Sequence, residues 1–267
     1  MRVTHLSLTD FRSYSHLNLE FEPGQNIFIG ENGEGKTNII EALMYLALLS
    51  SHRISTDQPL VKLGSERAYI RATIESNDRN TLLELEINAA KANRAKINQN
   101  PTRSQKELLG IVKSVCFSPE DLDLVRGDPS ERRSFMDQLL IQRSPRLAGV
   151  ITDYERALKQ RNSLLKSRAP IAALEPWNEH LANFGSEVVA GRLTLIKEIE
   201  PLFQNAYKNL SEKKEAFLGY KSSIPSPSVN KAENKEKILT VINELNIQER
   251  ERGVSLVGPH RDDLLLN

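Results

Sequence analysis

Cysteine, long apolar runs and an excess of either charge are all missing from this sequence. Cys116 is the single cysteine among 267 residues, so no internal disulfide can form, and the five histidines are scattered without metal-ligand spacing. No apolar run reaches the roughly 18 residues that span a bilayer, and Glu41 interrupts the longest one, residues 39–49. The N-terminus has no signal-peptide pattern, so we expect a cytoplasmic protein.

The charges nearly cancel, because 36 basic and 35 acidic side chains give a net charge of +1. This balance excludes a uniformly basic nucleic-acid-binding protein, although a local basic face is still allowed. Hydrophobic residues make up 39% of the chain and charged residues 27%, which is typical of a folded globular protein. The length suits one large domain or two smaller ones.

Strand patterns and one helix account for the first fifty residues. Residues 3–8 and 17–21 alternate apolar and polar side chains, the period of half-buried strands. Residues 26–29 form a nearly continuous apolar run, which predicts a strand buried on both faces. A glycine-rich loop follows, and residues 37–49 then place apolar side chains at helical spacing. The predicted order is strand, glycine-rich loop, helix.

Strand patterns return between residues 68 and 117, and helical patterns then dominate to residue 250. Residues 68–74 and 82–88 predict a hairpin, and residues 114–117 and 255–257 predict two further strands. The basic run from Lys91 to Lys113 is interpreted as a solvated hairpin tip, with a nucleic-acid contact as the alternative. The predicted helices are residues 130–142, 146–168, 176–210 and 232–250.

Eight consecutive residues match the P-loop pattern of Gly, four residues, then Gly-Lys-Ser/Thr. They are Gly30, Glu31, Asn32, Gly33, Glu34, Gly35, Lys36 and Thr37. The glycines let successive backbone amides face phosphate oxygens, and the helix that follows adds the positive end of its dipole. Lys36 can reach the β- and γ-phosphates of a nucleotide, and the Thr37 hydroxyl can ligate Mg²⁺. We expect the side chains of Glu31 and Glu34 to face solvent.

Further motifs run along the whole chain and narrow this prediction. They are Asp10–Tyr14, Pro119–Asp121, Leu124–Asp137 with its Gly-x-Pro-x-x-Arg-Arg-x-Phe-x-Asp pattern, Tyr154 with Leu158–Asn162, and Gly258–Leu264. Together with the P-loop, and in this order, they resemble the RecF family of SMC/ABC-type ATPase heads. The resemblance implies an α/β P-loop NTPase head with an inserted helical lobe. Residues 1–125 would form ATPase lobe I, residues 126–252 helical lobe II, and residues 253–267 the start of a return to the ATPase lobe.

The resemblance also implies roles for individual residues. Lys36 and Thr37 would hold the triphosphate of ATP and Mg²⁺, and Arg12 would lie near the phosphates. Arg53 stands where related ATPases place an arginine that touches the nucleotide, so Lys36 and Arg53 are the candidate catalytic residues. A solvated loop residue is the alternative for Arg53. A Leu-Ser-x-Gly-Gln-like signature and an apolar strand ending in two acidic residues do not occur in the sequence. We therefore expect a C-terminally truncated head, with weak ATPase activity only in the full-length protein.

Two adjacent arginines, Arg132 and Arg133, fall near a predicted helix start, where the helix dipole disfavours positive charge. DNA phosphate would explain them, and so would a salt bridge to Asp128, Glu131 or Asp137. The sequence leaves both explanations open.

For the full-length protein the resemblance implies an ATP-driven homodimer that binds DNA at junctions of single strand and duplex. With RecO and RecR it would help to load RecA, in DNA replication, recombination and the SOS response to damage. A P-loop kinase with Arg53 or Arg132 as lid arginines is the rival function, and a scaffold that does not respond to nucleotide is a third. The long helical stretch after Ser130 argues against a small kinase, which would continue to alternate strands and helices.

Overall fold

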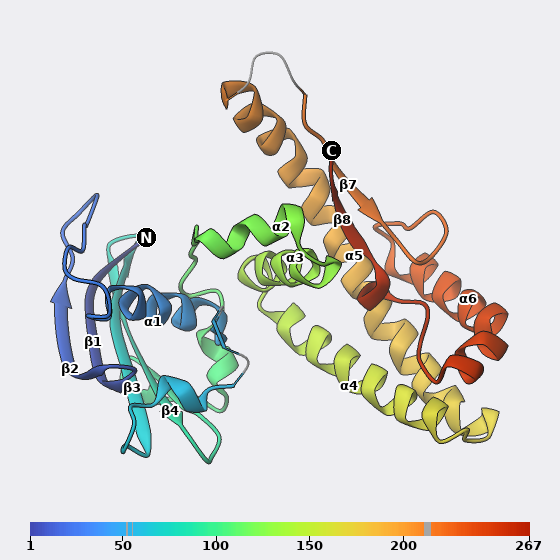
Figure 1. Ribbon diagram of the computed structural model, residues 1–267, viewed down its shortest axis with the longest axis horizontal. Helices are drawn as coiled ribbons and strands as arrows, with labels where there is room; N and C mark the ends of the chain where they lie inside the picture. Colours follow the sequence, from blue (N-terminus) through green and yellow to red (C-terminus); the bar gives the residue numbers. More distant parts are fainter. Residues whose placement is uncertain (52, 55, 211–214) are drawn as a thin grey trace. The chain divides into compact units, whose positions relative to one another are not determined.

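The computed structural model describes residues 1–51, 53, 54, 56–210 and 215–267, without the side chain of Glu120. The chain divides into two compact units, Met1–Cys116 (unit 1) and Phe117–Asn267 (unit 2), which are coloured blue to green and green to red in Figure 1. This division falls before the lobe boundary expected at residue 125. Residues 253–267, expected to begin a return to the first lobe, lie in unit 2.

Unit 1 is built on an antiparallel sheet with the strand order β2-β1-β3-β4-β5-β6. Its strands are β1 (Arg2–Phe11), β2 (Tyr14–Glu20), β3 (Arg67–Ser76), β4 (Arg79–Asn88), β5 (Arg94–Ile97) and β6 (Asn100–Pro101). Alternation places Ile70 and Ala72 in the core, while Arg71 between them faces outward. The turn between β3 and β4 has positive φ at Asn77 and Asp78, as a two-residue hairpin requires. The predicted hairpin and the first two predicted strands are confirmed.

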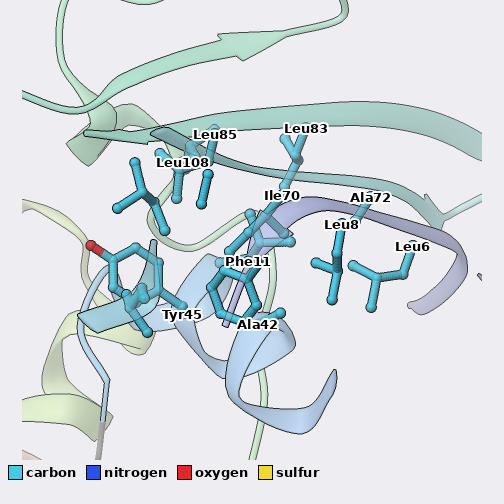
Figure 2. Close-up of a cluster of buried hydrophobic side chains, with 14 of the residues drawn as sticks. Leu6, Leu8, Phe11, Ala42, Tyr45, Ile70, Ala72, Leu83, Leu85 and Leu108 are labelled. Carbon is cyan, nitrogen blue, oxygen red and sulfur yellow. The ribbon is translucent and has the colours of Figure 1, made fainter. Parts of the chain in front are cut away.

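The core of unit 1 lies between this sheet and helix α1 (Lys36–Leu48). Figure 2 shows Tyr45 and Ala42 of α1 against Leu8 and Phe11 of β1, all fully buried. Burial of each large apolar side chain contributes about 1.5–3 kcal/mol. The Tyr45 hydroxyl accepts a hydrogen bond from Asn93 at 3.3 Å. These contacts fix α1 on the sheet, and the glycine-rich loop precedes α1 directly.

Two predicted strands, residues 26–29 and 114–117, do not form. Four of their apolar side chains are largely exposed, namely Ile27, Ile29, Val115 and Phe117. A strand needs a neighbour to accept and donate its backbone hydrogen bonds. Within the described part of each unit, no strand pairs with these segments. An apolar run alone therefore does not predict a strand, because the segment also needs a neighbouring strand with which to pair.

Unit 2 is helical, with one small antiparallel sheet. Its helices are α2 (Asp123–Arg126), α3 (Pro129–Arg143), α4 (Arg146–Lys166), α5 (Ile171–Leu210) and α6 (Lys231–Arg252), and β7 (Leu218–Lys221) pairs with β8 (Asp263–Leu266). Helix α6 begins at the side-chain cap of Asn230 and ends at Gly253, whose φ of 67° suits a left-handed C-terminal residue. The predicted helices are confirmed, although α5 begins five residues before Pro176.

The strand predicted at residues 255–257 does not form, because side chains take its backbone groups. The Ser255 amide donates to Asn162 at 2.7 Å, and the Leu256 amide donates to Glu249 at 2.7 Å. The last strand is β8 instead. In the described part of the chain, no helix is both long and apolar enough to cross a membrane.

Two buried arginines hold unit 2 together. Arg161 and Glu249 form an ion pair at 2.6 Å, with side chains 2% and 0% exposed. Arg192 binds both carboxylate oxygens of Asp137 at 2.9 and 2.8 Å and donates to the Pro259 carbonyl at 2.7 Å. These pairs connect α3, α4, α5 and α6 with the segment before β8.

Candidate phosphate-binding site

The glycine-rich loop turns sharply into α1, and two glycines make the turn possible. Gly33 and Gly35 have φ values of 91° and 96°, a region that favours glycine. A Cβ at Gly35 would also lie 2.8 Å from Ser13 Oγ and 3.0 Å from the ring of Tyr14. The loop therefore leads directly into the first turn of α1, where backbone amides begin the helix. Such amides have no partner inside the helix and suit an anion.

Lys36, the first residue of α1, turns its ammonium group back over the loop. Nζ donates to the carbonyls of Gly30 at 2.7 Å and Glu31 at 2.5 Å. The hydroxyl-bearing Thr37 follows it and is exposed, as is Asn32 within the loop. The structure thus brings together the predicted lysine, the predicted magnesium ligand and the predicted loop amides.

Glu34 differs from its expected orientation. Its carboxylate Oε2 accepts a hydrogen bond from the Glu31 amide at 3.0 Å, and a Cβ at Gly30 would overlap that oxygen. Glu31 and Glu34 are exposed, as expected, but the Glu34 carboxylate also folds back onto a loop amide, which was not expected. A side-chain carboxylate can bind the same backbone amides as a phosphate, because the carboxylate and the phosphate are both anions. Tyr14 donates to the Glu34 carbonyl at 3.3 Å, and burial, with the nearby Glu34 charge, raises the pKa of the Tyr14 hydroxyl.

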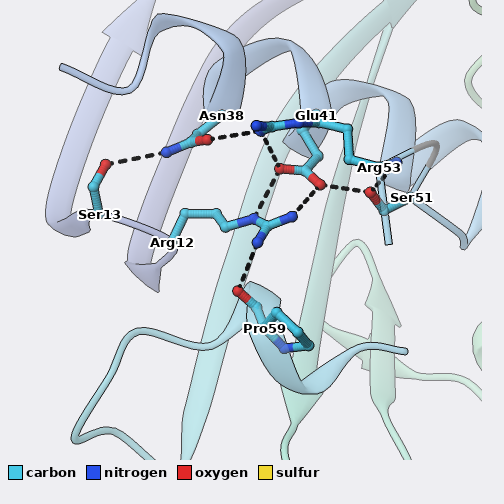
Figure 3. Close-up of polar contacts among 7 residues, drawn as sticks. All are labelled: Arg12, Ser13, Asn38, Glu41, Ser51, Arg53 and Pro59. Atoms are coloured by element: carbon cyan, nitrogen blue, oxygen red, sulfur yellow. Dashed lines mark hydrogen bonds and ion pairs between the residues drawn. The ribbon is translucent and has the colours of Figure 1, made fainter. Parts of the chain in front are cut away.

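Arg12 lies beside α1, bound to a buried carboxylate. Its Nε and Nη2 atoms donate to Glu41 at 2.9 and 2.5 Å, and Nη1 donates to the Pro59 carbonyl at 3.0 Å (Figure 3). The Ser51 hydroxyl donates to the same carboxylate at 2.5 Å. Burial raises the pKa of Glu41, but the hydrogen bonds from Arg12 and Ser51 and the charges of Arg12 and Arg53 outweigh it and lower that pKa. Glu41 is therefore ionised at neutral pH.

Arg53 reaches the same carboxylate from the segment that follows α1. Its Nη1 lies 3.4 Å from Glu41 Oε2 and 3.3 Å from Asn38 Oδ1. Asn38 in turn donates to Ser13 Oγ at 3.1 Å. The two arginines that the sequence assigned to the nucleotide thus share one carboxylate, next to the first turn of α1. Sequence reasoning missed Glu41 and Asn38, although a charge inside the apolar run 39–49 was a signal for Glu41.

The adjacent arginines of α3, in unit 2, have different environments. Arg132 binds both carboxylate oxygens of Asp263 at 2.7 and 3.0 Å and donates to the Leu124 and Gly127 carbonyls. The salt bridge weighed for this residue exists, but its partner is none of the three carboxylates considered. Arg133 donates to the Asp262 carbonyl at 3.1 Å.

Comparisons with known proteins identify the family and the fold. A family model described as an AAA domain matches residues 5–252. The DNA replication and repair protein RecF of Streptomyces avermitilis is 49% identical over 100% of this chain and 74% of its own length. RecF of Kineococcus radiotolerans is 46% identical over 100% of this chain and 73% of its own length.

Two solved structures share the fold. One, described as the recombination mediator protein RecF-ATPrS in the RecFOR pathway, has 25% identity and a TM-score of 0.93 and covers 100% of this chain and 74% of its own. The other, described as RecF-ATP in that pathway, has 26% identity and a TM-score of 0.91 and covers 99% of this chain and 72% of its own. The predicted α/β P-loop NTPase head with a helical lobe is confirmed.

Proposed function

The chain belongs to the RecF family of DNA replication and repair proteins, and we propose that it is an ATP-binding mediator of DNA repair and recombination in the cytoplasm. It binds DNA where single strand meets duplex and acts with RecO and RecR to help load RecA. ATP drives association of two heads, and slow hydrolysis in the full-length protein limits the lifetime of the dimer. The family membership supports this role, and the P-loop is the observation that supports its dependence on ATP.

Each part of the loop has a defined task in this proposal. Lys36 leaves the Gly30 and Glu31 carbonyls and binds the β- and γ-phosphates as a point charge. The amides from Gly33 onward donate to phosphate oxygens, and the Thr37 hydroxyl ligates Mg²⁺, which neutralises charge on the phosphates. The left-handed turns support this assignment, because they leave room for an anion where side chains would obstruct it.

Arg12 and Arg53 have unequal tasks. Arg12 has a side chain 17% exposed and makes two close hydrogen bonds to Glu41, which favours a role in positioning α1. Arg53 has a side chain 41% exposed and a longer contact of 3.4 Å. It can rotate toward a nucleotide at a smaller cost, because exposed pairs contribute only about 0–1 kcal/mol. We therefore assign the contact with nucleotide to Arg53.

Replacement of Lys36 by Met tests the nucleotide site. We expect ATP affinity to fall by about a hundredfold or more, because charge-assisted hydrogen bonds to the phosphates are lost. The fold should be unchanged, since Nζ contacts only two loop carbonyls. Isothermal titration calorimetry measures the affinity, with Lys91→Met as the control, an exposed lysine of the same unit. Equal affinity in both variants would exclude the proposed site.

The proposed dimer switch has a separate readout. Light scattering should show a doubling of the mass when ATP and Mg²⁺ are added to the full-length wild-type protein, and no doubling for its Lys36→Met variant. A mass that does not respond to ATP in the wild type would contradict the switch while leaving nucleotide binding intact.

A further inference from the structure

Unit 2 contains an open cavity of about 430 Å³ that the nucleotide site does not use. It lies where the start of α3, the end of β7 and the segment before β8 meet. Ionisable side chains from all three line it, namely Asp128, Arg133, Lys221, His260, Arg261 and Asp263. Two of the motif stretches that identify the family, residues 124–137 and 258–264, therefore converge here. We refer to this site as the basic cavity.

Three cations of the basic cavity have no carboxylate partner. Arg133 donates to the Asp262 carbonyl at 3.1 Å, and Arg261 donates to the Ser255 carbonyl at 3.1 and 2.9 Å. Lys221 is exposed. Among the residues that the structure describes, none of these three side chains forms an ion pair within 4.0 Å. Neutral carbonyls orient the two arginines without cancelling their charge.

The acidic side chains of the cavity balance little of this charge. Asp263 is already bound through both oxygens to Arg132. Asp128 remains as an exposed carboxylate. The lining side chains carry three positive and two negative charges, and one of the two negative charges, Asp263, is paired with Arg132 outside the lining, so positive charge is in excess in this concave site.

His260 adds no charge at neutral pH. Burial, together with the charges of Arg261 and Arg133, lowers its pKa to about 4. Its Nδ1 lies 2.5 Å from the Tyr154 hydroxyl, which fixes the ring. His260 therefore lines the cavity as an uncharged side chain, and the arginines around it make its environment electropositive.

We propose that the basic cavity holds a backbone phosphate of DNA, bound by Arg133, Lys221 and Arg261. This inference rests on the proposed function, because it assigns a place to the DNA contact. A phosphodiester carries one charge and accepts from several donors at once, which matches convergent cations oriented by neutral carbonyls. No Phe, Tyr or Trp lines the described cavity, so stacked bases are not expected and the contact does not depend on DNA sequence.

The test measures DNA binding by the full chain, with ATP and Mg²⁺ present. The probe is a fluorescent oligonucleotide with a junction of single strand and duplex. Its fluorescence anisotropy reports binding, measured at salt concentrations between about 50 and 200 mM. For the triple variant R133Q/K221A/R261Q we expect about tenfold weaker binding, and the slope of log K against log salt should fall by about one. Both changes should be the same for oligonucleotides of different sequence.

A matched variant, K159A/K197A/K208A, removes three exposed lysines of the same unit outside the cavity. It should change DNA affinity by less than about threefold. Equal losses in the two triple variants would overturn the proposal, since they would indicate a diffuse field. Unchanged DNA binding in the cavity variant would overturn it as well.

Separate readouts distinguish this proposal from the proposed function. ATP affinity should be unchanged in the cavity variant, and a loss of ATP binding would show that the phosphate belongs to the nucleotide and overturn the inference. A wild-type protein that binds ATP but no DNA would overturn both proposals. If the triple variant unfolds, Lys221→Ala decides, because its exposed side chain supports no contact in the described structure. It should weaken DNA binding roughly twofold or more, and no weakening would refute the site.

Discussion

Removal of the Arg12 side chain should isolate a buried carboxylate and destabilise unit 1. Glu41 is fully buried, and Arg12 donates two of the hydrogen bonds that it accepts, at 2.9 and 2.5 Å. After Arg12→Ala, the remaining partners are the Ser51 hydroxyl at 2.5 Å and Arg53 at 3.4 Å. One charge would then lie in the core with an incomplete set of partners.

The expected magnitude follows from these contacts. Removal of one partner from a buried ion pair costs about 3–5 kcal/mol. Because Ser51 and Arg53 still compensate part of the Glu41 charge, we expect the free energy of unfolding to fall by about 2–4 kcal/mol. Arg53→Ala should cost less than about 1 kcal/mol, because its side chain is 41% exposed and its contact is longer.

The loss should also depend on pH. In the folded protein the pKa of Glu41 is lowered from 4.5, so its ion pair stabilises the protein above that value and is lost as the pH falls through the folded pKa. Without Arg12, fewer contacts oppose the effect of burial, so the pKa of Glu41 should be higher than in the wild type and the variant should protonate this group at a higher pH. The difference in stability between wild type and Arg12→Ala is therefore largest at neutral pH and shrinks below about pH 4.5.

Urea unfolding followed by circular dichroism measures both effects. Trp177, the single tryptophan, lies in unit 2, so its fluorescence reports on the other unit and serves as an internal control. Equal losses for Arg12→Ala and Arg53→Ala at neutral pH would refute the reasoning. So would a loss from Arg12→Ala that stays constant on acidification.

Three further outcomes follow from other contacts. Glu34→Gln should raise ATP affinity about fivefold by calorimetry, because an anion leaves the phosphate cradle; unchanged or weaker binding would contradict this. Arg161→Met should lower the free energy of unfolding by about 3–5 kcal/mol by leaving Glu249 unpaired, whereas Arg156→Met, at the surface, should change it by less than about 1 kcal/mol. Tryptophan fluorescence in urea distinguishes the two. Because the pKa of His260 is lowered from 6.5 to about 4, stability should fall as the pH drops between these values, by up to about 1.4 kcal/mol per pH unit. In His260→Asn this pH-dependent part should disappear, and its persistence would rule out the assignment.

The phosphate-binding loop could be predicted from sequence because its chemistry is local. Glycines, a lysine and a threonine at fixed spacing specify a turn and a helix start without help from distant residues. The alternating strands β1 to β4 were predictable for the same reason, since one buried face repeats every second residue. Residues 26–29 were not, because an apolar run does not specify which strand pairs with the segment, and Ile27 and Ile29 are in fact largely exposed.

The polar interactions could not be predicted from the sequence, because the two partners of each one are far apart along the chain. Arg132 and Asp263 are separated by 131 positions, and Arg161 and Glu249 by 88. The orientation of Glu34 also escaped prediction, since it depends on the curvature of the folded loop. Only Glu41 carried a local signal, as a charge within the apolar run of α1.

The two adjacent arginines of α3 show how a fold separates structural charge from functional charge. The helix dipole disfavours both Arg132 and Arg133 equally, so sequence position cannot rank them. The fold supplies a carboxylate, Asp263, to one and only a carbonyl to the other. A buried cation with a carboxylate partner is balanced and has little left to offer a ligand, as Arg161 with Glu249 also shows. A cation that is oriented by a neutral carbonyl keeps its full charge, and it loses little conformational entropy when it binds an anion. Arg133 is therefore the arginine of this pair to which DNA phosphate should bind, although both belong to the same motif.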